Sequence, residues 1–367
     1  MTHYRLTPLA DSLPDTVPFV GPETQERARA QLFDARLGAN ENVFGPSPMA
    51  TRAMAETQLW KYGDPESYEL REALADYHGI LPEMIVVGEG IDGLLGYLAR
   101  LMVAPGDAVV TSDGAYPTFN YHVAGYGGVL HKVPYADDHE DIEALFAKAA
   151  EVNAKMVYVA NPDSPMGTAH DGTDIVAAME KLPKGTLLVL DEAYIECAPE
   201  GTALPLPMSD SRVIRLRTFS KAYGLAGARV GYAMGAPDLI AAFNKVRNHF
   251  GMNRAAQAGA LAALDDQTWL RSVQARITTS RNRITSIALK NGLRPLKSAA
   301  NFVAIDCRHG AEFAQNVLRE MVDRGVFIRM PLVAPQNRCI RISCGTPADL
   351  DILAEVLPEA LRYVEKG

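Results

Sequence analysis

The chain has 367 residues, of which 48% are hydrophobic and 22% are charged, a composition typical of a folded globular protein and not of a disordered or collagen-like one. Its 36 Lys and Arg residues are outnumbered by 44 Asp and Glu residues, which gives a formal charge of -8. Binding to the phosphate backbone of nucleic acids needs a positive footprint, so this balance argues against it. At about 100 to 200 residues per domain, the length predicts two domains.

Residues 1–45 read as a proline-rich arm with one predicted helix from Glu23 to Phe33. Over residues 46–245, short apolar runs alternate with helical patterns. Strands are predicted at residues 84–87, 108–111, 129–133, 156–160, 187–190, 213–216 and 230–234, and helices at 94–102, 116–124, 142–150 and 175–182. This alternation predicts an α/β fold: a large domain with a mostly parallel sheet flanked by helices.

Residues 246–367 continue a helix-rich stretch that runs from Leu239 to Asn291, and then change to a small α+β pattern. Apolar runs at 302–305, 326–328 and 339–342 predict strands, and residues 311–323 and 347–361 predict helices. We expect a small domain that is assembled from both chain ends.

The four cysteines, at positions 197, 307, 339 and 344, form no Cys-x-x-Cys pair and are too sparse to cross-link this chain. They predict a reducing, cytoplasmic location. No run of about 18 apolar residues occurs, so we expect no membrane association. The eight histidines form no His-Glu-x-x-His motif and no Cys/His cluster, so we expect no metal site.

A glycine-rich turn, Gly88-Glu-Gly-Ile-Asp-Gly93, follows the first predicted strand of the sheet and precedes a helix. The Gly-x-Gly-x-x-Gly spacing by itself suggests a dinucleotide fold, but it begins 88 residues into the chain and no acidic residue ends a strand about 20 residues later. Glycines let the backbone approach an anion, and a helix N-terminus offers free N–H groups. The turn therefore predicts a phosphate site more strongly than a nicotinamide site.

Two further strand ends carry reactive side chains, a carboxylate and an amine. Asp191 ends the buried run Leu187-Leu-Val-Leu, at the sheet edge where parallel sheets bind ligands. Lys221 follows another strand and lies between Arg217 and Arg229, whose positive charges would favour its neutral, nucleophilic amine. The chain has no Gly-x-x-x-x-Gly-Lys-Ser/Thr motif and no Gly-x-Ser-x-Gly motif, which argues against a nucleotide-metal site and a serine hydrolase. An amine, a strand-end carboxylate and a phosphate cradle together indicate a pyridoxal 5'-phosphate site.

At these residues the chain resembles the fold-type-I pyridoxal-phosphate aminotransferases of class I/II, in particular the histidinol-phosphate aminotransferase-like branch. The matching segments include, in order, PFVGPE at 18–23, LGANEN at 37–42, YGDPES at 62–67, GEGIDG at 88–93, NPDSPMG at 161–167, DEAY at 191–194, RTFSKAYGLAGAR at 217–229 and RISCGT at 341–346. The block at 217–229 is highly specific. The resemblance covers nearly the whole chain and implies an amino-acid-metabolising transferase.

The resemblance implies a role for each matching position in binding the cofactor. Lys221 would form the Schiff base, Asp191 would pair with the ring nitrogen, and Tyr194 would hydrogen-bond the phenolic oxygen. Tyr116 would stack on the ring. The remaining cofactor contacts would be to the phosphate, from the backbone of Ile91 and Asp92 and from Ser220 and Arg229.

The resemblance also implies the substrate contacts and the assembly. Arg341 would hold the substrate carboxylate in a bidentate pair, Arg329 would meet a second anionic group, and Asn40 would lie against the substrate. Tyr62 would reach the phosphate of the neighbouring subunit's cofactor, which implies a homodimer with shared active sites. The reaction implied moves an amino group from histidinol phosphate, an aromatic amino acid or another amino acid or amine to a 2-oxo acid such as 2-oxoglutarate.

The sequence departs from the family pattern in NPDSPMG, where Ser164 replaces the usual asparagine that contacts the phenolic oxygen. Serine is shorter, which leaves Tyr194 as the main partner and Asn161 as a substitute. The changed hydrogen bond keeps an alternative open, in which the same fold catalyses decarboxylation, elimination or oxidation of an amino acid. A nicotinamide dehydrogenase is a more distant alternative. A pyridoxal-phosphate-binding regulator would need a basic DNA-binding extension, which the N-terminal arm lacks.

Overall fold

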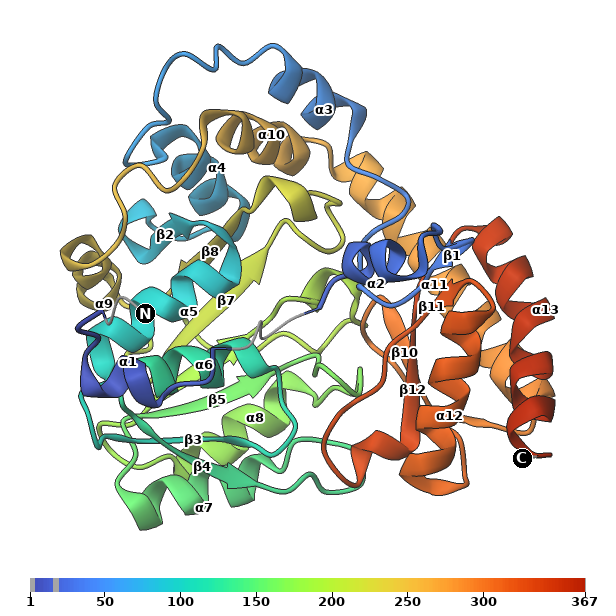
Figure 1. The fold of residues 1–367 in the computed structure, drawn as a ribbon. Coiled ribbons are helices and arrows are strands. Elements are labelled where there is room, and N and C mark those ends of the chain that lie inside the picture. Colours follow the sequence, from blue (N-terminus) through green and yellow to red (C-terminus); the bar gives the residue numbers. More distant parts are fainter. Residues whose placement is uncertain (1–3, 16–19, 367) are drawn as a thin grey trace.

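The computed structural model describes residues 4–15 and 20–366, and Figure 1 shows a large unit built around one sheet beside a smaller unit that contains the C-terminus. Seven strands form the large sheet in the order β2-β8-β7-β6-β5-β3-β4. All neighbours pair in parallel except β8, which is antiparallel to both β2 and β7. The strands are β2 (Ile85–Gly88), β3 (Ala108–Ser112), β4 (Val129–Val133), β5 (Met156–Ala160), β6 (Leu187–Asp191), β7 (Val213–Thr218) and β8 (Gly231–Met234). The predicted mostly parallel sheet is confirmed.

Helices cover both faces of this sheet, so the central strands β5 and β6 are buried at every residue. One face packs against α5 and α6, and the other against α7 and α8. Continuous apolar runs, in place of an alternating pattern, follow from this two-sided burial. The helices of the large unit are α3 (Pro48–Ala55), α4 (Tyr68–His78), α5 (Gly90–Met102), α6 (Pro117–Gly125), α7 (Ile142–Val152), α8 (Gly172–Ala178), α9 (Pro237–Ala242) and α10 (Arg254–Asp265).

The smaller unit contains the antiparallel sheet β12-β10-β9 and a short parallel pair, β1 with β11. Because β1 comes from the N-terminal part of the chain, both chain ends contribute to this unit. Its strands are β1 (Ala35–Arg36), β9 (Arg294–Pro295), β10 (Phe302–Asp306), β11 (Val326–Phe327) and β12 (Cys339–Ser343), and its helices are α2 (Pro22–Arg29), α11 (Gln267–Lys290), α12 (Gly310–Asp323) and α13 (Pro347–Val364). The N-terminal arm carries α1 (Pro8–Ser12).

Two predicted helices end differently from the sequence pattern. The helix expected over residues 23–33 stops at Arg29, because Ala30 adopts the left-handed conformation with φ +53°. The helix-rich stretch from 239 to 291 is broken by residues 246–253, which form a loop between α9 and α10. The four cysteines are buried, unpaired thiols. Within the described residues, no helix is long and apolar enough to span a membrane.

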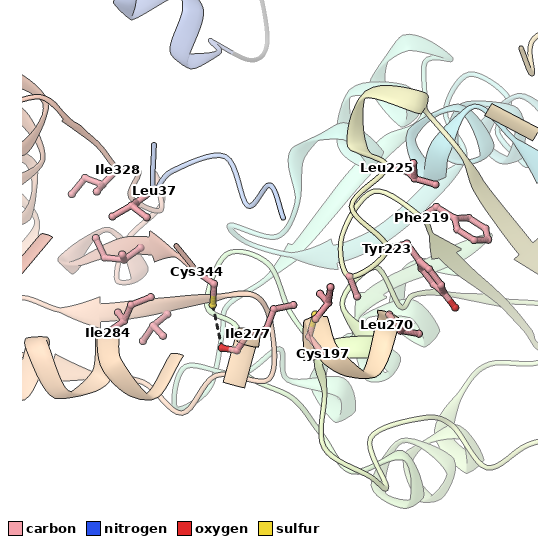
Figure 2. Close-up of a cluster of buried hydrophobic side chains, with 14 of the residues drawn as sticks. Leu37, Cys197, Phe219, Tyr223, Leu225, Leu270, Ile277, Ile284, Ile328 and Cys344 are labelled. Carbon is pink, nitrogen blue, oxygen red and sulfur yellow. Dashed lines mark hydrogen bonds between the residues drawn. The ribbon is translucent and has the colours of Figure 1, made fainter. Parts of the chain in front are cut away.

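A single hydrophobic cluster joins the two units. Figure 2 shows its side chains extending from Leu37 and Ile328 in the smaller unit, past Ile277 of α11, to Phe219 and Leu225. The last two residues flank Lys221 on both sides. The segment that carries Lys221 is therefore anchored in the same hydrophobic core that packs the smaller unit against the large one.

Candidate active site

A cavity lies at the C-terminal ends of β5, β6 and β7, beside the N-terminus of α5. It is lined by Ile91, Asp92, Tyr116, Tyr158, Ala160, Pro162, Ser164, Asp191, Ala193, Tyr194, Thr218, Ser220, Lys221 and Arg229. The carboxyl edge of a parallel sheet is where ligands bind in open α/β folds. Nine of the residues predicted for the site line this one cavity.

The N-terminus of α5 forms a cradle on one side of the cavity. Its N-cap residue, Glu89, makes no side-chain capping hydrogen bond, which leaves backbone N–H groups available to an anion. Gly90 has φ +81°, and a Cβ at this position would lie 2.6 Å from Arg229 Nη2. A Cβ at Gly231 would lie 2.8 Å from Ile91 N. The two glycines thus let backbone, guanidinium and ligand come together, and the cradle fits a phosphate.

Polar side chains complete this cradle. Arg229 Nη1 donates to Ser220 Oγ at 3.3 Å, and its Nη2 lies 3.6 Å from Asp92 Oδ2. Tyr116 Oη donates to the other oxygen of Asp92 at 3.1 Å. Tyr116 and Arg229 are therefore held on opposite oxygens of one carboxylate, at the rim of the predicted anion site.

Asp191 also lines the cavity, at the end of the fully buried strand β6. Its Oδ2 accepts a hydrogen bond from Tyr158 Oη at 2.7 Å, and its Oδ1 accepts from the backbone N–H of Ala193 at 2.9 Å. Burial raises the pKa of Asp191 to about 6, although the Tyr158 hydrogen bond and the nearby Lys221 charge act against that rise. A buried carboxylate with lone pairs to spare can hold a protonated ring nitrogen.

Lys221 follows β7 in a tight turn, in which the N–H of Gly224 donates to its carbonyl at 2.9 Å. Its Nζ lies 5.2 Å from the centre of the Tyr194 ring. Tyr194 Oη accepts a hydrogen bond from Asn40 Nδ2 at 3.0 Å. Within residues 4–15 and 20–366, no carboxylate forms an ion pair with Lys221, so its amine is available to a ligand.

Arg217 was expected to act as a cationic neighbour of Lys221, but its side chain binds Glu192. Its Nε binds Glu192 Oε2 at 2.8 Å, and the other oxygen of this buried glutamate binds Arg215 at 2.7 Å. Arg217 also does not line the cavity. Adjacent residues of a strand point to opposite faces, so Arg215 and Arg217, two positions apart on β7, share a face. On that face the two arginines together neutralise the charge of Glu192.

Asn161 is likewise turned away from the predicted role. Its Nδ2 donates to the carbonyls of His170 and Thr202, each at 3.1 Å, and its Oδ1 accepts from the His170 N–H at 2.9 Å. The buried amide therefore fastens the loop after β5, and the expectation that Asn161 substitutes for the missing asparagine is not met. Ser164 does line the cavity.

Asn40 is buried beside the cavity, with φ +56°. In addition to binding Tyr194, its Oδ1 accepts from Ser343 Oγ at 2.8 Å and its backbone N–H donates to the same hydroxyl at 2.9 Å. Its carbonyl accepts from Asn301 Nδ2 at 3.0 Å. The structure thus gives Asn40 a positioning contact with Tyr194 that the sequence had not indicated.

The two predicted substrate arginines lie on adjacent segments of the smaller unit. Arg341 is on β12 and its backbone exchanges hydrogen bonds with Arg329. Arg341 Nη2 approaches the Gly38 carbonyl at 3.5 Å, and within the described residues its buried Nε has no hydrogen-bond partner. Arg329 Nη2 donates to the Val20 carbonyl. Burial lowers the pKa of both arginines, and the charge of Arg341 lowers that of Arg329 further.

Tyr62 lies outside the cavity. Its side chain is 78% exposed and its ring packs on Phe250 at a centroid distance of 4.8 Å. The sequence also missed residues that line the cavity, chiefly Tyr158 and Thr218. Tyr158 carries the one hydroxyl in the run Met-Val-Tyr-Val-Ala of β5, a signal that could have been noticed.

These geometric features agree with what the chain is similar to. The profile of the family "Aminotransferase class I and II" matches residues 35–357. The chain belongs to this family of aminotransferases, which confirms the resemblance and the enzyme class that it implied.

Among its relatives is a histidinol-phosphate aminotransferase of Erythrobacter litoralis, 37% identical over 90% of this chain and 91% of that protein. A crystal structure of histidinol-phosphate aminotransferase from Sinorhizobium meliloti, in complex with pyridoxal 5'-phosphate, is 53% identical, covers 99% of both chains and has a TM-score of 0.95. An aspartate aminotransferase from Thermus thermophilus, 21% identical with a TM-score of 0.81 over 98% of this chain and all of that one, shares the fold.

Proposed function

We propose that this aminotransferase binds pyridoxal 5'-phosphate in the cavity at the end of β5, β6 and β7 and moves an amino group from histidinol phosphate to a 2-oxo acid such as 2-oxoglutarate. The observation that carries the proposal is the convergence of Lys221, Asp191 and the uncapped N-terminus of α5 on one cavity. These are an amine, a carboxylate and an anion cradle, the groups that a phosphorylated pyridine aldehyde requires.

When bound, the cofactor supplies an aldehyde that links covalently to amines and a ring that accepts electrons from the carbon bearing the amino group. Lys221 Nζ would take the proton from that substrate carbon as general base and, as general acid, would return it to the aldehyde carbon of the cofactor. The Asp191 carboxylate would pair with the ring nitrogen and favour its protonated form. Tyr194 lines the cavity, and the hydrogen bond from Asn40 holds its hydroxyl, which would bind the phenolic oxygen of the cofactor.

The arginine pair supports an anionic donor. Arg341 has a buried Nε with no hydrogen-bond partner within the described chain, and Arg329 adjoins Arg341 through the backbone. Guanidinium groups bind phosphate and carboxylate in bidentate geometry. The relatives are histidinol-phosphate aminotransferases, and a phosphate monoester is an anion that two arginines would hold. Aromatic and other amino acids are the competing donors.

The competing reaction, decarboxylation, elimination or oxidation of an amino acid, would use the same Lys221 and Asp191. The observation that favours it is Ser164, whose shorter side chain replaces an asparagine on the cavity wall while Asn161 is engaged elsewhere. The two reactions differ in what leaves the substrate: transamination returns the nitrogen on a new amino acid, whereas the alternatives release ammonia or carbon dioxide.

The exposed apolar side chains around Tyr62 support a homodimer with shared active sites. Leu59, Trp60 and Tyr62 are 77%, 80% and 78% exposed, and Phe250 is packed on Tyr62. A cluster of large exposed apolar side chains on one side of a folded protein is typical of a protein interface. The unpaired cysteines support a reducing, cytoplasmic location.

The test is to supply the purified protein with pyridoxal 5'-phosphate, 2-oxoglutarate and a panel of donors that includes histidinol phosphate, phenylalanine and lysine, and to measure glutamate, ammonia and carbon dioxide. We expect glutamate with histidinol phosphate as the best donor. Lys221→Ala should lower the rate by more than about 10²-fold, because the general base is removed. Lys290→Ala, at the exposed end of α11, is the matched control. Wild-type rates in Lys221→Ala, or ammonia in place of glutamate, would rule the proposal out.

A further inference from the structure

Tyr158 is a polar side chain on the cavity wall for which the sequence assigned no role. It lies on β5, and parallel pairing with β6 sets Tyr158 opposite Val189 and Ala160 opposite Asp191. Because side chains alternate along a strand, Tyr158 and Asp191 project from the same face of the sheet. That face is the one covered by α5 and α6.

The Tyr158 side chain is fixed before any ligand binds. It is fully buried, and its ring stacks on Phe119 with centroids 4.7 Å apart and planes 16° apart. Its hydroxyl reaches Asp191 Oδ2 at 2.7 Å. Burial and the Asp191 charge raise the pKa of Tyr158 well above its ordinary value, so the hydroxyl keeps its proton and is the donor.

Asp191 therefore receives a hydrogen bond on each oxygen, one from Tyr158 and one from the Ala193 N–H. Hydrogen bonds to a carboxylate favour its charged form. Without the tyrosine proton, a carboxylate this deeply buried would be left with one protein donor and would become protonated more readily. A protonated Asp191 cannot hold a positive ring nitrogen.

We propose that Tyr158 is a positioning residue that keeps Asp191 ionised and aimed at the ring nitrogen of the bound cofactor. The proposal rests on the cofactor site inferred above. Tyr158 acts through Asp191, so its removal changes the pH range in which the cofactor ring is bound, while the phosphate cradle at α5 is unaffected.

The experiment measures the binding of pyridoxamine 5'-phosphate, which cannot link covalently to Lys221, to the full-length cofactor-free protein between pH 5 and pH 8. Wild-type affinity should fall as the pH drops through about 6, where Asp191 takes up a proton. In Tyr158→Phe, which keeps the stacked ring, we expect the midpoint to rise by about one pH unit, because a hydrogen bond to a charged group is lost. Inorganic phosphate uses the cradle alone, so the pH dependence of its binding reports the titration of the phosphate itself. This pH dependence should be the same in Tyr158→Phe as in the wild type.

Three controls separate the outcomes. Tyr232→Phe removes another buried hydroxyl, bound to His78 at 3.0 Å, and should keep the wild-type midpoint. Replacing Tyr158 with 3-fluorotyrosine, a stronger donor of the same shape, should move the midpoint down, and this tests the proposal even if Tyr158→Phe does not fold. In an Asp191→Asn background, Tyr158→Phe should have no further effect.

The failures are distinguishable. If Asp191→Asn binds pyridoxamine 5'-phosphate as the wild type does, the proposed cofactor site is wrong. If Asp191→Asn weakens binding but both Tyr158 replacements leave the midpoint where it was, the cofactor site stands and the role of Tyr158 is overturned.

Discussion

His78, the last residue of α4, is a partly buried histidine whose Nε2 lies 3.0 Å from Tyr232 Oη. Burial, with the charges of Arg217 and Arg215 beyond it, lowers its pKa from 6.5 to about 3. In the unfolded chain the same ring takes up a proton below about pH 6.5. Below that pH the unfolded state binds more protons than the folded state, so folding stability falls as the pH falls.

We expect acidification from pH 7 to pH 5 to lower the urea midpoint of the wild type more than that of His78→Gln, which cannot titrate. The cost is at most about 1.4 kcal/mol for each pH unit below 6.5. Urea unfolding followed by circular dichroism at the two pH values measures it. Equal losses in the two proteins would show that His78 does not contribute to the acid sensitivity.

At the scale of elements, the site depends on how closely β8 approaches the start of α5. A methyl group at Gly231 would lie 2.8 Å from both Gly90 C and Ile91 N, closer than carbon atoms pack against backbone. The backbone of the cradle would have to move, and overpacking of this kind costs about 1–3 kcal/mol.

Gly231→Ala should therefore weaken the binding of pyridoxal 5'-phosphate by about tenfold or more, since about 1.4 kcal/mol corresponds to a factor of ten. The matched control is Gly227→Ala, where an added methyl group would meet no atom within 4 Å. Titration of the cofactor, followed by absorbance, compares the two variants. Unchanged affinity in Gly231→Ala would mean that the cradle tolerates displacement.

At the scale of the whole molecule, the exposed surface around Tyr62 predicts that one active site uses residues of two subunits. Lys221→Ala and Tyr62→Ala subunits should each be impaired alone. In a dimer of one of each, one site has an intact Lys221 and an intact Tyr62. Random pairing of equal amounts should therefore restore about a quarter of the native sites.

Co-expression of the two variants, followed by the glutamate assay, tests this expectation. The control is a mixture of the two proteins made after purification and assayed before subunits exchange, which should show only the sum of the separate activities. If the co-expressed protein gives no more than that sum, or sediments as a monomer, sharing of sites is wrong.

Most of the cofactor site could be predicted from the sequence because its residues lie in short contiguous motifs at strand ends. Lys221, Asp191 and the turn at Gly90 need only local chain geometry and the parallel order of strands to meet at one sheet edge. The alternation of strands and helices could also be predicted, because strands buried on both faces have continuous apolar sequences.

Side-chain direction was decided only by the tertiary structure. Arg217 turns to Glu192 and Asn161 to the carbonyls of its own loop, because buried charges and amides take the partners that folding brings within reach. Asn40 meets Ser343 and Tyr194 across large sequence separations, and Tyr158 meets Asp191 only through the register of β5 and β6. The sequence alone determined the strand-end groups Lys221 and Asp191 and the glycine turn, because these lie in short local motifs, whereas the packing of distant segments determined which other side chains line the cavity and which turn away from it.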